Sequence, residues 1–210
     1  CIALLLQATG VAHPLANGGF LAWPLALLLY YLILRGREEL IGKLLPYVHP
    51  VPVWFAAILI AWELQWWVGR VPGIAEVWRL LPIGLVPALF LLLLKLLIDR
   101  VSWPFAAHRR AYLLIGSLPL AACVWLWNIY MNFHSPGDAA PLPFIPVLNP
   151  LDLAEGIITV IVVMWIIQVM REEPATTDEQ LPVLLAVLSG TLLYWLTMET
   201  VRVVHHWGGV

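Results

Sequence analysis

Charged residues are scarce in this chain of 210 residues. Lysine, arginine, aspartate and glutamate make up 11% of it, whereas hydrophobic residues make up 62% and the mean hydropathy is +0.89. A soluble domain carries about 25% charged residues, so this composition excludes one. The net charge of −2 and the lack of a basic cluster also exclude nucleic acid as a partner.

Cysteines and the short motifs of soluble enzymes are equally sparse. The two cysteines, Cys1 and Cys123, make neither a disulfide framework nor a metal site. The sequence has no HExxH, GxSxG, Walker or GxGxxG motif, so we expect no cofactor. His205 and His206 are adjacent, and neighbouring side chains on a helix point about 100° apart, so we predict no metal site.

Long apolar runs are the main feature that the sequence does have. A membrane-spanning helix needs about 20 mostly apolar residues, and in lipid every backbone polar group must be paired internally. We therefore predict an all-α fold, a polytopic transmembrane helical bundle with about six full spans. The predicted spans are residues 18–34, 51–69, 80–98, 111–133, 153–170 and 181–204, and residues 1–11 are interpreted as the end of a truncated N-terminal span.

The chain starts at Cys1 with an apolar run that no positively charged region precedes, so this run is not an intact signal peptide. We expect residues 1–210 to form a single transmembrane domain that is a fragment of a longer membrane protein. Its expected partners are the lipid bilayer and either the remaining spans of that protein or other membrane subunits.

Basic residues are unevenly shared between the two sides of the predicted bundle. One set of connecting segments carries eight of them and the alternate set carries three, so the positive-inside rule makes the first set cytoplasmic. We predict the inner membrane of a bacterium, with loops 70–79 and 132–150 and the C-terminal tail in the periplasm. The eight are Arg35, Arg37, Lys43, Lys95, Arg100, Arg109, Arg110 and Arg171, and the three are Arg70, Arg79 and Arg202.

Polar side chains inside the predicted spans gather in the periplasmic half, where Asn128 and Glu155 lie near span ends. An ionisable group in hydrocarbon costs about 3 kcal/mol on insertion scales, so each one requires a partner or a function. Glu199 and Arg202 share a helix face, and His206 follows one turn later. This row could bind an anion and move a proton. It could equally be a self-neutralising ion pair beside a hydrated imidazole.

The loop before the fifth predicted span is rich in proline. Four prolines in residues 141–150 impose a stiff, extended path. Asn149 precedes Pro150 and Asp152, which predicts a helix N-cap, proline at the first helical position and an acid against the helix dipole. Asn149 and Asp152 therefore have a structural role, and their loop would also cover the outer polar groups.

Two stretches, PFIPVLNPLDLAEG and ETVRVVHHWGGV, resemble motifs of a bacterial family of predicted multi-spanning membrane proteins, domain of unknown function 2339. Members of that family are much longer, so the resemblance implies that this chain is a C-terminal portion. It also implies an inner-membrane location, and it assigns no activity. The motifs fall on Asn149, Pro150, Asp152, Leu153, Arg202, His205, His206 and Trp207.

Three functions follow from these patterns. The first is a periplasm-facing polar pocket that binds or passes an anionic or lipid-linked envelope substrate. The second is a membrane-embedded acyl or glycosyl transferase, and the third is a structural or assembly subunit of a membrane complex. The predicted binding residues are Arg202, Asn128, Asn149, Asp152 and Glu155, and the catalytic candidates of the transferase are His205, His206 and Glu199.

Overall fold

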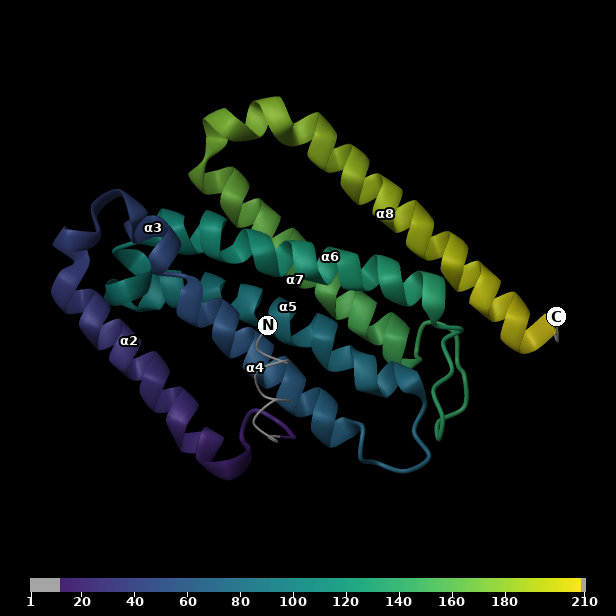
Figure 1. The fold of residues 1–210 in the computed structure, drawn as a ribbon. Helices are drawn as coiled ribbons and strands as arrows, with labels where there is room; N and C mark the ends of the chain where they lie inside the picture. The colour runs from purple at the N-terminus through teal and green to yellow at the C-terminus, as the bar shows by residue number, and fades with distance from the viewer. Residues whose placement is uncertain (1–11, 209–210) are drawn as a thin grey trace.

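The computed structural model describes residues 12–208, and of residues 174–181, 183 and 184 it describes the backbone alone. The long helices run up and down in an antiparallel bundle (Figure 1), and the short helix α3, Leu45–Val48, lies at one end of it. A π-helical stretch, Ala111–Gly116, leads into α6. The long helices are α2 (Gly19–Ile41), α4 (Val51–Val68), α5 (Glu76–Arg100), α6 (Ser117–His134), α7 (Pro150–Glu172) and α8 (Pro174–Gly208).

The predicted all-α transmembrane bundle is confirmed. Within the described part of the chain, five helical segments are long and apolar enough to cross a membrane, and they coincide with the first five predicted spans. The sixth predicted span, 181–204, lies within α8, which has 35 residues. The predicted truncated span, 1–11, falls outside the described residues. The five segments are Ala16–Val48, Val51–Val68, Glu76–Arg100, Ala111–His134 and Pro150–Glu172.

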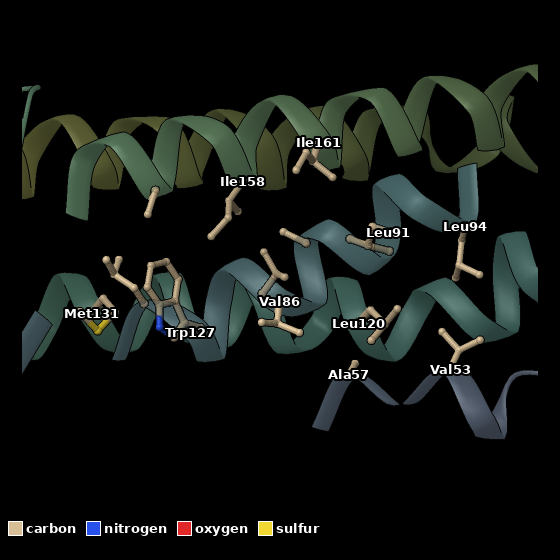
Figure 2. Packing of buried hydrophobic residues seen from close by; sticks show 14 of the residues in the cluster. Val53, Ala57, Val86, Leu91, Leu94, Leu120, Trp127, Met131, Ile158 and Ile161 are labelled. Carbon is tan, nitrogen blue, oxygen red and sulfur yellow. The ribbon is translucent and has the colours of Figure 1, made fainter. Parts of the chain in front are cut away.

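Helix α5 is the centre of the bundle, because α4, α6 and α7 all pack against it. In the most apolar 18-residue stretch of α5, half of the residues are buried. In the corresponding stretch of the segment Ala16–Val48, 6% are buried. Figure 2 shows side chains such as Leu91 of α5 and Leu120 of α6 meeting in this core. Lipid tails are as apolar as leucine, so these helices associate through close packing rather than through burial from water.

A glycine allows α5 and α6 to approach each other closely. A Cβ atom built on Gly84 would lie 2.7 Å from Cε2 of Trp127, which is closer than real Cβ contacts. The indole Nε1 of Trp127 donates a hydrogen bond to the carbonyl of Leu80 at 2.8 Å. The ring of Trp127 therefore occupies the space that a side chain at position 84 would need.

Ion pairs join the helices at the end of the bundle that carries most of the basic loops. Arg109 donates from Nε and from a terminal nitrogen to Glu172 of α7, both at 2.6 Å, and it also reaches Asp99 of α5 at 2.9 Å. The hydrogen bonds to Glu172 raise the pKa of the Arg109 guanidinium above its ordinary value. Arg109 thus links the ends of α5 and α7 through ion pairs with both helices.

Candidate functional site

The first turn of α7 places two of the predicted binding residues. The side-chain Oδ1 of Asn149 accepts hydrogen bonds from the backbone N–H groups of Leu151 and Asp152, both at 3.0 Å. Its Nδ2 donates to Oδ2 of Asp152. The predicted N-cap is confirmed, and it fixes the Asp152 carboxylate at the buried start of the helix.

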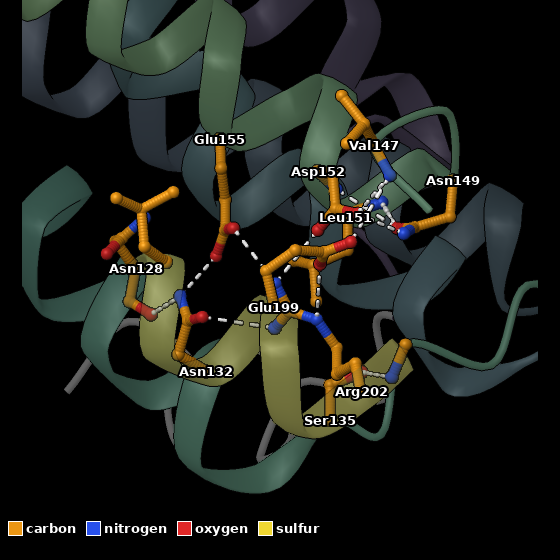
Figure 3. A network of polar contacts seen from close by, with 12 residues as sticks. Asn128, Asn132, Ser135, Val147, Asn149, Leu151, Asp152, Glu155, Glu199 and Arg202 are labelled. Atoms are coloured by element: carbon orange, nitrogen blue, oxygen red, sulfur yellow. Dashed lines mark hydrogen bonds and ion pairs between the residues drawn. The ribbon is translucent and has the colours of Figure 1, made fainter. Parts of the chain in front are cut away.

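Arg202 of α8 lies at the centre of a polar network and is only 2% exposed (Figure 3). Its terminal nitrogens donate to Oδ1 of Asp152 at 2.8 Å and to Oδ1 of Asn132 at 3.0 Å. Its Nε donates to Oε2 of Glu199 at 3.2 Å, and Oε2 of Glu155 lies 3.5 Å from a terminal nitrogen. One guanidinium therefore joins α6, α7 and α8, which meet at this end of the bundle. Arg202, Asn132, Asp152, Glu155 and Glu199 are called the Arg202 network below.

Asn132 links the two sides of the Arg202 network. Its Nδ2 donates to Oε1 of Glu155 and to the carbonyl oxygen of Asn128, the latter at 2.9 Å. Asn128 thus contributes its backbone, whereas its side-chain Oδ1 is buried and makes no hydrogen bond with the described residues. Oε2 of Glu155 is likewise buried without a hydrogen bond there. Two buried oxygens of this region can therefore still accept a proton or a donor.

A strained residue of the loop before α7 is tied to the Arg202 network. Val147 has a φ of +66°, which is unfavourable for a β-branched residue. Its backbone N–H donates to Oδ2 of Asp152 at 3.1 Å and to Oε1 of Glu199 at 3.2 Å. Two carboxylates from two helices therefore hold one strained peptide in place, and the position of the loop depends on them.

The two histidines of α8 lie beside the loop rather than in the Arg202 network. Nε2 of His206 lies 2.8 Å from the carbonyl oxygen of Pro136, and its ring stacks on Phe144 with centroids 4.0 Å apart. The ring of His205 lies edge-on to that of His206 at 5.2 Å. Both side chains are at the surface or near it. Of the predicted row, the structure brings Glu199 and Arg202 together, and His206 holds the loop next to them.

Glu63 is a further buried acid among the described residues at this end of the bundle, and it forms a separate cluster. It accepts hydrogen bonds from Nε1 of Trp67 at 2.6 Å and from the backbone of Leu15 at 3.0 Å, and it pairs with His13 at 2.8 Å. The polar residues therefore divide into a cluster on α4 and the Arg202 network on α6, α7 and α8.

An apolar groove of about 330 Å³ lies between α6 and α8. Phe133 of its lining is adjacent to Asn132, and Tyr194 precedes Glu199 by five residues, so the groove approaches the Arg202 network along both helices. The hydroxyl of Tyr194 donates to the carbonyl of Ile129 across the groove at 3.4 Å. The lining residues are Trp125, Ile129, Phe133, Ala186, Val187, Gly190, Thr191 and Tyr194.

Comparison with known proteins identifies one family. The family described as "Predicted membrane protein (DUF2339)" matches residues 1–210. The chain belongs to the DUF2339 family. This match confirms the resemblance seen in the two sequence motifs, and it extends over the whole chain. No curated protein and no solved structure matches the chain. The DUF2339 chain is therefore a multi-pass membrane protein.

Sequence reasoning missed two participants of the site. Asn132 was visible only as a neighbour of Asn128 on the same helix face, and its central position depends on α8 lying beside α6. Val147 carries no polar side chain, and nothing in its sequence context marks a positive φ. The proline-rich loop around it was the only available sign.

Proposed function

We propose that this chain is part of a transport protein of the bacterial inner membrane, whose outer end binds or passes an anionic, lipid-linked envelope substrate. Proton binding by the acids around Arg202 would control access to the guanidinium. The observation that carries the proposal is the buried Arg202, surrounded by the carboxyl groups of Asp152, Glu155 and Glu199.

The charge of the Arg202 network supports control by protons. Three ionised carboxylates and one guanidinium would leave a net charge of −2 away from water, and burial of unbalanced charge is strongly unfavourable. Protons on the acids remove this imbalance. A protonated Asp152 also holds Arg202 less strongly, which frees its planar fork for a phosphate or carboxylate group.

The groove between α6 and α8 supports a lipid-linked substrate. Its lining is almost entirely apolar, and it includes Phe133, the neighbour of Asn132 in the sequence, and Tyr194, which precedes Glu199 by five residues. A hydrocarbon chain in this groove would place an anionic head group toward Arg202. The chemistry of the two neighbouring features therefore fits an amphiphile with an acidic head.

The distribution of basic residues supports the orientation. In this proposal the Arg202 network, loops 70–79 and 132–150 and the C-terminal tail face the periplasm, because the opposite end carries most of the basic residues. The lipid bilayer and the remaining spans of a longer chain, or other membrane subunits, would complete the surroundings of α2 and α8.

The contacts favour this proposal over the transferase. The transferase expected from the sequence pairs a histidine base with a carboxylate partner such as Glu199. The hydrogen-bonding partner of His206 is the carbonyl of Pro136, and Glu199 bonds to Arg202 and Val147. The experiment described next distinguishes the transport proposal from a structural or assembly role.

Lipid binding by the purified full-length protein tests the proposal. Fluorescent phosphatidylglycerol and phosphatidylcholine with identical acyl chains are titrated in neutral detergent at about pH 5.5 and about pH 8. We expect tighter binding of phosphatidylglycerol, and a stronger preference at the lower pH because protonated acids release Arg202. Asp152→Asn should raise the affinity for phosphatidylglycerol at the higher pH and flatten the pH dependence.

Two arginine variants separate a specific site from general attraction to positive charge. Arg202→Gln should abolish the preference for phosphatidylglycerol. Arg70→Gln is the matched control, because Arg70 is exposed at the same end of the bundle and stacks over Trp66 at 3.6 Å. Equal binding of both lipids by a correctly folded wild-type protein would contradict the proposal and favour the assembly role. Retention of the preference by Arg202→Gln would contradict it as well.

A further inference from the structure

Three metal-binding side chains meet at the opposite end of the bundle, far from the Arg202 network in the sequence. They are Glu38 near the end of α2, His49 between α3 and α4, and His108 in the segment before α6. Nε2 of His49 lies 3.5 Å and Nε2 of His108 lies 3.3 Å from Oε1 of Glu38. One ligand atom from each residue lies within 4.8 Å of the other two.

The imidazole of His49 presents an unpaired nitrogen to this cluster. The side chain is fully buried, and its Nδ1 lies 3.2 Å from the hydroxyl of Tyr112. That hydroxyl lies 3.2 Å from the carbonyl oxygen of His49 and 3.3 Å from the hydroxyl of Tyr31, so it can donate to one of them and accept the proton of Nδ1. Nε2 faces the carboxylate of Glu38 and makes no hydrogen bond with the described residues. A cation between these two atoms, a metal ion as well as a proton, would satisfy both of them.

Two of the three distances between ligand atoms match those of a tetrahedral metal site. The imidazoles of His49 and His108 stack with their ring centroids 3.8 Å apart, so one ring has to turn for both nitrogens to bind one ion. With bonds of about 2.0 Å from Zn²⁺ to imidazole nitrogen and carboxylate oxygen, two ligand atoms in tetrahedral geometry lie about 3.3 Å apart. The two nitrogen–oxygen distances here are 3.3 and 3.5 Å.

A second layer of contacts orients the three side chains. Nε1 of Trp103 donates to Oε1 of Glu38 at 2.7 Å, and the hydroxyl of Tyr112 is the partner of Nδ1 of His49. Metal-binding histidines commonly have such a partner on the other ring nitrogen. The side chains of Glu38 and His108 are 26% and 18% exposed, so an ion can enter and a water molecule can complete its coordination.

We propose that Glu38, His49 and His108 bind one divalent transition-metal ion, with Zn²⁺ as the ion that suits two imidazoles and one carboxylate. The site departs from the expectation that the chain binds no metal, and it is independent of the function proposed for the Arg202 network. The bound ion ties the end of α2 to the segments that precede α4 and α6.

Zinc binding by the tag-free, full-length protein tests this proposal. The protein is stripped with a chelator and titrated with ZnSO₄ by isothermal calorimetry, and bound zinc is counted by mass spectrometry after gel filtration. We expect one Zn²⁺ per chain that is lost in Glu38→Gln and in His108→Gln. Tyr112→Phe should weaken binding about 10–100-fold, because it removes only the partner of His49.

Matched variants keep the outcome decisive. Glu39→Gln changes an exposed acid next to Glu38 and should bind zinc as the wild type does. The variants change Glu38 and His108 rather than His49, because loss of the fully buried His49 would disturb folding. Glu38→Gln keeps an acceptor for Trp103. Absence of saturable zinc binding by the folded wild type would overturn the proposal. So would binding that survives Glu38→Gln and disappears in His206→Gln, because the ion would then sit at the other end of the bundle.

Discussion

Replacement of Arg202 by glutamine should destabilise the bundle more than any other single change of charge. The guanidinium contacts three buried carboxyl groups, and its removal leaves them without a cation. Removal of one partner from a buried ion pair costs about 3–5 kcal/mol, and we expect Arg202→Gln to reach this range. The control Arg70→Gln removes an exposed stacking contact, which is worth about 0.5–1 kcal/mol.

The assay is reversible unfolding of the purified protein in mixed micelles, followed by intrinsic fluorescence, for which the chain carries 12 tryptophans. A second change tests the cause. Asp152→Asn removes one of the uncompensated charges, so it should restore part of the stability of Arg202→Gln. A loss below about 1 kcal/mol in Arg202→Gln, or no recovery in the double variant, would refute the reasoning, because the network would then contribute no more than surface ion pairs do.

Three further changes test other parts of the structure by thermal unfolding. Gly84→Ala should cost about 1–3 kcal/mol, because its Cβ would collide with the ring of Trp127. Asn149→Ala should cost about 1 kcal/mol, because two backbone N–H groups at the start of α7 lose their acceptor. Arg109→Gln should cost at most about 1 kcal/mol, and the difference should shrink in about 0.5 M salt, because its pairs with Glu172 are partly exposed.

Each of these changes has a control within the chain. Gly156 of α7 has open space around its Cβ position, so Gly156→Ala should be neutral or stabilising by up to about 1 kcal/mol. Equal effects of Gly84→Ala and Gly156→Ala would contradict the close approach of α5 and α6. Asn149→Ser keeps a capping oxygen and should retain part of the stability that alanine loses. An effect of Arg109→Gln that does not depend on salt would contradict a surface ion pair.

The helices were predictable because the hydrocarbon core imposes a length and an internal pairing rule on every span. The pairing of Glu199 with Arg202 was also predictable, because residues three apart on one helix lie on the same face. The N-cap at Asn149 was also readable, because asparagine before proline is a local pattern. These features depend on neighbouring residues alone.

The remainder of the site depends on contacts between distant segments. The sequence alone could not show that Asn132 of α6 meets Arg202 of α8, because the two residues are 70 positions apart and no pattern between them sets how the helices are arranged. The cluster of Glu38, His49 and His108 was missed for the same reason, since its spacing matches no short metal-binding motif. Periodicity places a residue on a helix face, and only packing decides which helix that face meets.

Proton uptake on lipid binding tests the central claim most directly. Isothermal titration of phosphatidylglycerol into the purified protein, repeated at one pH in buffers of different ionisation enthalpy, gives the number of protons exchanged per lipid. We predict uptake of about one proton per bound lipid, because an acid must be protonated before Arg202 is free, and a smaller uptake in Asp152→Asn. Binding without any proton exchange, or with proton release, would contradict control of Arg202 by its surrounding carboxyl groups.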